Sequence, residues 1–134
     1  MVRQRMVQDS AHGNYSLSLQ RQTVYCDYAD GFNLSGVRKL TLDILSLTTS
    51  LNEWVLFQRP TESAGVTHDA IGEMMAGYLA FQEAGCKAVG IVENSIFVHA
   101  GSPHRPSSLT MPFMIDKDET KIQHWLSQIR LSSH

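Results

Sequence analysis

Apolar residues in the middle of the chain form two short continuous runs, with a stretch of helical spacing between them. The first run covers residues 54–57, and the second covers residues 88–92 of the strand-like segment 87–92. Such runs, bounded by polar residues and breakers, are typical of strands buried on both faces. Between them, apolar residues from Ile71 to Leu79 recur at the spacing of one helical face and predict a helix over residues 68–84. This order predicts a right-handed crossover between two parallel strands.

The ends of this unit carry boundary signals. Arg59 and Pro60 are expected to end the first strand, because proline cannot donate a hydrogen bond to a neighbouring strand. The Thr67 hydroxyl is expected to cap the helix, and the carboxylate of Asp69 suits the positive end of the helix dipole. Gly85 follows the helix, where a left-handed residue commonly ends it.

The segment before this unit predicts a hairpin and a helix. Residues 15–19 and 23–28 alternate between apolar and polar side chains, which indicates two half-buried strands that pair antiparallel. Asn33 is a good cap for the first helix, whose apolar side runs from Val37 to Leu51. Asn52 is expected to stop this helix.

The segment after the second buried run is harder to interpret. Residues 96–98 allow either a short strand or one helical turn, and residues 101–108 predict a loop because they hold two prolines and a glycine. Residues 112–115 predict a final strand. Asp116, with Glu119 three residues later, predicts a capping-box-like start for the last helix.

This order of elements predicts an α/β fold: a mixed sheet of about five strands, with an antiparallel N-terminal pair followed by parallel strands, packed against helices. The 134 residues suffice for one domain with a sizeable core. We expect a flexible tail over residues 1–11 and a single domain over residues 12–132.

The net charge, the length of the apolar stretches and the number of cysteines limit which partners and compartments the sequence favours. A formal net charge of −2 gives no general attraction to nucleic acid, and no apolar stretch is long enough to span a membrane. Cys26 and Cys86 are too few for a disulfide scaffold, which indicates reduced core residues of a cytoplasmic protein.

The order of elements, and the ending of residues 114–119 that leads to Trp125 and Leu126, resemble SpoIIAA-like, or STAS-like, domains. The resemblance implies a regulatory or binding module without catalytic residues, and the broad fold group also includes lipid carriers. In anti-sigma-factor antagonists of this family, a serine in an Asp-Ser-Ser-Gly motif is phosphorylated. The corresponding residues 61–65 keep one serine and make Ser63 the candidate phosphoacceptor, although they lack the tandem serines and the preceding aspartate.

Ligands of open α/β sheets bind beyond the carboxyl ends of the parallel strands, which is where the loops after both buried strands lie. Arg59, Ser63 and the free N–H groups after Thr67 are suited to hold a phosphate or carboxylate. A capped helix beside a solvated arginine is the alternative. The full set of ligand- or anion-binding candidates is Arg59, Ser63, Thr67, His68, Glu93, His99, His104 and Arg105.

Two catalytic interpretations have less support. Ser63, His68 and Asp69 suggest a hydrolase, but adjacent helical residues point in different directions and no Gly-x-Ser-x-Gly motif is present. His99 and His104, with Glu93 nearby, do not match a known zinc spacing. We therefore expect no metal and no cofactor.

Three functions follow in order of preference. The first is a non-catalytic STAS-like module that acts through a protein partner or a small ligand. The second is a carrier of a small hydrophobic ligand or lipid, with a pocket between helix 68–84 and the sheet that is lined by residues such as Met74, Met75 and Tyr78. A hydrolase-type enzyme is third. A homodimer is expected, through an exposed strand edge or the small-residue stripe that includes Gly72 and Ala76.

Overall fold

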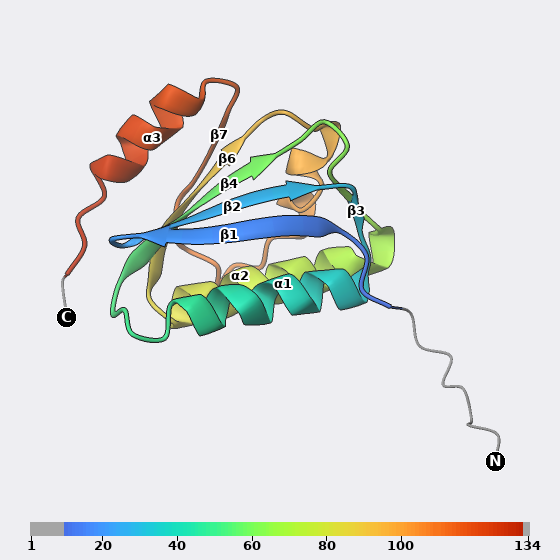
Figure 1. Cartoon of the computed structure of the whole chain (residues 1–134), viewed down its shortest axis with the longest axis horizontal. Coiled ribbons are helices and arrows are strands. Elements are labelled where there is room, and N and C mark those ends of the chain that lie inside the picture. Colours follow the sequence, from blue (N-terminus) through green and yellow to red (C-terminus); the bar gives the residue numbers. More distant parts are fainter. Residues whose placement is uncertain (1–9, 133–134) are drawn as a thin grey trace, which may run out of the picture.

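A five-stranded mixed sheet with helices on both faces forms the protein (Figure 1). The structure is a computed structural model and describes residues 10–132. In sheet order the strands are β1 (Asn14–Gln20), β2 (Thr23–Ala29), β4 (Trp54–Pro60), β6 (Cys86–Val92) and β7 (Phe113–Asp116). β1 and β2 are antiparallel and all other neighbours are parallel, which confirms the predicted fold class.

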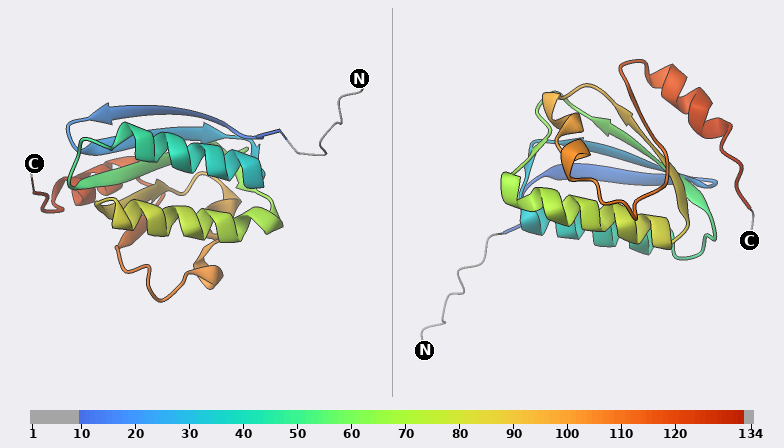
Figure 2. Two further views of the ribbon diagram at one scale, coloured as in Figure 1. Left: turned by 90° about the horizontal axis from the view of Figure 1, so that it is seen from below. Right: turned by 180° about the vertical axis from the view of Figure 1, so that it is seen from behind.

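Helices cover the two faces of the sheet unequally. α1 (Leu34–Leu47) and α2 (Ile71–Glu83) lie side by side against one face, and α3 (Glu119–Ser127) lies against the other (Figures 1 and 2). Residues 1–9 of the expected N-terminal tail lie outside the described residues. No helix of residues 10–132 is long and apolar enough to cross a membrane.

The central strand β4 alternates between two cores. Trp54 and Leu56 pack into the core beneath α1 and α2, whereas Val55 and Phe57 pack beneath α3. All four side chains are at most 1 % exposed. β4 runs parallel to β6, with Leu56 opposite Val89, and α2 connects the two strands as predicted.

β4 ends at Pro60, as predicted, but Arg59 and Pro60 belong to the strand instead of following it. Pro60 lies opposite Tyr28 of β2, but pairing with β6 has already stopped at Gln58. The N–H that proline lacks is therefore not needed on the β6 side, and the strand continues for two residues. The Pro60 carbonyl instead accepts a hydrogen bond from the Asn94 side chain at 3.1 Å.

The first helix begins where the sequence predicts and ends earlier. The Asn33 side chain accepts hydrogen bonds from the backbone N–H groups of Gly36 (2.8 Å) and His12 (2.9 Å), which confirms Asn33 as the cap of α1. α1 ends at Leu47 rather than near Asn52. The Thr48 hydroxyl donates back to the helix carbonyl of Ile44 at 3.0 Å, a local bond that competes with continued helix.

Two predicted caps were wrong. The Thr67 hydroxyl donates to the Asp69 carboxylate at 2.6 Å rather than accepting from a helix N–H, and the short 3-10 turn η1 (His68–Ala70) leads into α2. The cap of α3 is Asp118, whose carboxylate accepts from two N–H groups of the first turn. Asp116 instead accepts from the N–H of Asp118 at 2.8 Å.

Short elements that hydrophobic periodicity did not reveal surround the carboxyl end of the sheet. β3 (Gly31–Phe32) and β5 (Gly65–Val66) form a separate two-stranded parallel sheet. Residues 96–98 belong to the 3-10 turn η2 (Ile96–His99), one of the two predicted alternatives. The expected loop contains a second turn, η3 (Ser102–His104).

The contact between α1 and α2 depends on a glycine. A Cβ atom at Gly77 would lie 2.6 Å from the Thr41 hydroxyl oxygen, closer than a real Cβ tolerates, whereas nothing lies within 4 Å of a Cβ at Gly72. Gly72 and Ala76 of the small-residue stripe are exposed, so this stripe does not make the contact between the helices. Dimerisation through it stays a prediction.

We expect Gly77→Ala to lower the free energy of unfolding by about 1–2 kcal/mol, because the added methyl overpacks the helix contact. The matched variant Gly72→Ala should raise it by about 0.5 kcal/mol, because alanine is the better helix former and meets no neighbour. Urea unfolding measures both. Equal effects of the two variants would contradict the close approach at Gly77.

Candidate functional site

An apolar cavity of about 90 Å³ lies between α1, α2 and the carboxyl end of the sheet. Its fourth side is the segment that carries η2 and η3, which passes alongside α2 (Figure 2, right). Most of the lining is apolar and includes Phe32, Val37, Ile44, Met74, Met75, Phe81, Ile91, Val98, Phe113 and Ile115. This is the location that the sequence predicted for a pocket between residues 68–84 and the sheet.

Hydrogen bonds fix both ends of this covering segment, which runs from Ser95 to Met111. At its start, the Ser95 hydroxyl donates to the Ala64 carbonyl at 2.5 Å and accepts from the Phe97 N–H at 3.1 Å. At its end, the Gln82 amide of α2 donates to the Ser108 carbonyl at 2.9 Å and accepts from the N–H of Met111 at 2.9 Å. The cover is therefore tied to the β4–α2 loop and to α2.

The covering segment runs close to the methionines of α2. A Cβ atom on Gly101 would lie 2.5 Å from the terminal methyl of Met75 and 2.9 Å from that of Met74. The flexible ends of these side chains can yield to such an atom, but only by moving into the remaining space. Gly101 therefore helps to keep the cavity open.

Polar groups enter the cavity at a few points. The buried Tyr78 hydroxyl donates to the side-chain carbonyl of Gln58 at 2.5 Å, and burial raises the pKa of Tyr78 well above its usual range. The Arg105 guanidinium lies 4.2 Å from the centre of the Phe113 ring, which contacts the Tyr78 ring edge-on at a centroid distance of 5.0 Å. Tyr78 therefore stays neutral and serves as a hydrogen-bond donor at physiological pH.

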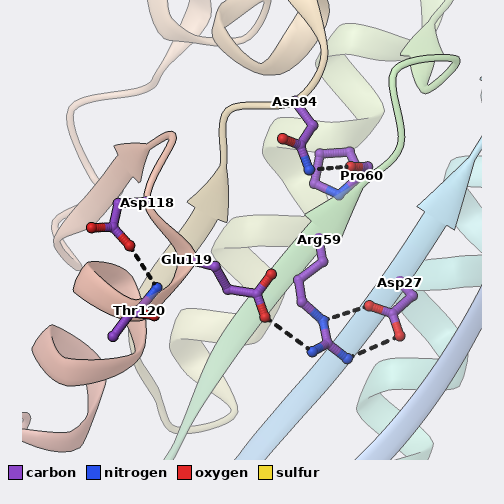
Figure 3. A network of polar contacts seen from close by, with 7 residues as sticks. All are labelled: Asp27, Arg59, Pro60, Asn94, Asp118, Glu119 and Thr120. Atoms are coloured by element: carbon purple, nitrogen blue, oxygen red, sulfur yellow. Dashed lines mark hydrogen bonds and ion pairs between the residues drawn. The ribbon is translucent and has the colours of Figure 1, made fainter.

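Arg59, a predicted anion ligand, lies on the opposite face of the sheet. Its guanidinium binds both carboxylate oxygens of Asp27, at 2.6 and 3.0 Å, and contacts Glu119 of α3 at 3.4 Å (Figure 3). It also lies over the ring of Tyr25 at 5.1 Å. Two carboxylates already neutralise this arginine, and it does not contact Ser63.

Ser63 is exposed on the loop between β4 and β5. Its hydroxyl oxygen accepts from the Asp30 N–H at 3.1 Å and lies 2.8 Å from the Thr61 hydroxyl. Within residues 10–132 no hydrogen bond joins Ser63 to His68 or Asp69, so the arrangement for a catalytic triad is not formed. Phosphorylation of Ser63 stays a prediction.

The histidine candidates are only partly brought together. The imidazole of His99 lies 3.0 Å from the Glu93 carboxylate at the surface. His104 belongs to η3 and forms no hydrogen bond or ion pair with His99 or Glu93 among the described residues. The described part of the chain contains no group of three His, Cys, Asp or Glu side chains placed to hold a metal ion.

Of the eight candidates, Arg105 is the one that the structure places at the cavity. Gln58, the polar partner of Tyr78, was not among the residues predicted from the sequence. The signal was present: Gln58 is 6 % exposed and follows Trp54 and Leu56 at alternating positions, so its side chain had to enter the same core.

The comparisons with known proteins support the fold. No family model and no curated protein matches the chain. Among solved structures, the chain is similar to an uncharacterised protein of the DUF3478 family with a SpoIIAA-like fold from Shewanella loihica PV-4. The TM-score is 0.57 and the identity 13 %, over 91 % of this chain and 99 % of the other. The chain therefore has a SpoIIAA-like fold, as its sequence resemblance implied.

We expect Arg59→Ala to leave the response to phosphate unchanged, because Asp27 and Glu119 already occupy the guanidinium. Thermal unfolding with and without inorganic phosphate should show the same small shift in the variant and in the unaltered chain. A stabilisation by phosphate that disappears in Arg59→Ala would show that this arginine binds anions after all.

Cys26 and Cys86 should resist alkylation in the folded protein. Burial raises the pKa of both thiols to about 12, so the reactive thiolate is scarce at pH 8. Mass spectrometry after iodoacetamide treatment should find no adduct without denaturant and two with it. Rapid modification of the folded chain would contradict the burial of these residues.

Proposed function

We propose that the protein is a non-catalytic binding module whose ligand is a small, largely apolar molecule held in the cavity between α2 and the sheet. The observation that carries this proposal is an open apolar space whose cover is hydrogen-bonded at both ends. Concave, mostly apolar sites with a few placed polar groups are typical of small-molecule binding.

The size of the cavity favours a compact ligand over a lipid. An engineered cavity of about 150 Å³ holds benzene, and this one measures about 90 Å³. The adaptable side chains of Met74 and Met75 can enlarge the space for a single ring or a short branched chain. A long acyl chain does not fit without a larger rearrangement of the cover.

A regulatory role is compatible with this site. The covering segment includes η2, where Ile96 is 88 % exposed and Phe97 is 47 % exposed. Phe97 also lines the cavity, so a bound ligand would contact a segment that a partner protein can reach. Exchange of a small ligand would in this way change a surface, which requires no catalytic residue.

Isobutyramide, a neutral branched compound with no more non-hydrogen atoms than benzene, is a suitable probe of the cavity. We expect the unaltered protein to bind it with a dissociation constant of about 1 mM or tighter. Gly101→Ala should weaken binding about tenfold, because the added methyl pushes the Met75 side chain into the cavity. The backbone of Gly101 has φ −83°, so alanine introduces no backbone strain.

Isothermal titration calorimetry measures the affinities, with Gly72→Ala as the matched control on the exposed side of α2. The control should bind like the unaltered protein. Absence of binding to the unaltered protein, or equal binding by Gly101→Ala, would contradict the proposed site.

A further inference from the structure

The hydroxyl groups of Thr41, Ser95 and Tyr78 line the cavity, but all three already donate within the protein. Their acceptors are the Val37 carbonyl at 2.9 Å, the Ala64 carbonyl at 2.5 Å and the Gln58 side-chain carbonyl at 2.5 Å. These hydroxyls therefore have no hydrogen left to donate to a ligand.

Other polar groups of the lining keep hydrogens to donate. The side-chain carbonyl of Gln58 is occupied by Tyr78, which leaves its NH₂ group with no partner among residues 10–132. No side-chain nitrogen or oxygen in this range is both sealed from solvent and unpaired, so this NH₂ group reaches the cavity space. Tyr28 also lines the cavity, and its hydroxyl has no hydrogen-bond partner in the described chain.

Arg105, an exposed residue of the lining, adds a positive charge at the solvent-facing edge of the cavity. It is the one charged residue among the described residues of the lining, and no carboxylate of residues 10–132 pairs with it. Its guanidinium packs on Phe113, which packs on Tyr78, so the charge lies one ring away from the pair of Tyr78 and Gln58. An apolar cavity with a free cation and free donors suits an anion that carries acceptor oxygens.

We propose that the ligand is a compact carboxylic acid bound as its anion, with the carboxylate facing Arg105 and the apolar body against Met74 and Met75. A carboxylate fits better than a phosphate ester, because the lining offers one cation and the space is small. Near pH 7 such an acid is ionised. This inference rests on the proposed function, since it concerns the same cavity.

Isobutyrate and isobutyramide are matched probes, because they have the same size and shape and differ in charge. Calorimetric titration at pH 7 and low salt should show that the unaltered protein binds the carboxylate about tenfold more tightly than the amide. Arg105→Gln should weaken carboxylate binding about tenfold and leave amide binding within about twofold. Arg105→Lys should keep part of the preference, because it retains the charge.

Arg130→Gln is the matched control, since Arg130 is an exposed arginine that does not line the cavity and its variant should bind like the unaltered chain. Equal affinity for both probes, or a preference that survives in Arg105→Gln, would overturn the carboxylate assignment. If the amide still bound and Gly101→Ala still weakened it, the proposed function would stand without this inference. Failure of both probes to bind the unaltered protein would overturn both.

Discussion

Burial of β4 on both faces is the constraint on which the rest of the structure depends. A strand with neighbours on both sides and apolar side chains in both directions needs a covering layer above and below. α1 and α2 supply one layer and α3 the other, and the two cores meet only through the sheet. The cavity lies in the layer formed by α1 and α2, near the point where the pairing of β4 with β6 stops. The helices alone do not fill the space there.

The same alternation of β4 assigns its polar residues to different tasks. Gln58 continues the row of Trp54 and Leu56 and enters the cavity, where Tyr78 satisfies its carbonyl. Arg59 continues the row of Phe57 and emerges on the other face, where Asp27 and Glu119 neutralise it. A buried polar group without a partner costs about 1–3 kcal/mol, and the hydrogen bond from Tyr78 removes this cost for the Gln58 carbonyl.

The fold was predictable from the sequence because its strongest signals are local. Continuous apolar runs, one helical period and the Asn33 cap identified the sheet, the crossover and the start of α1. The caps at Thr67 and Asp116 were wrong because several short polar side chains compete near each helix start. The site was predicted less well: Arg59 and Ser63 are near in sequence but face different surroundings, whereas Gln58, Tyr78 and Arg105 meet only through tertiary packing.

The central claim is that a small ligand binds inside the cavity beside α2 rather than on the surface of the protein. Methyl NMR of protein labelled with ¹³C at the methionine methyl groups tests it most directly, because Met74 and Met75 line the cavity while Met114 packs in the core beneath α3. On titration with isobutyrate, we predict that the methyl signals of Met74 and Met75 shift and that of Met114 does not. Shifts of Met114 alone, or none at either methionine of α2, would contradict the account.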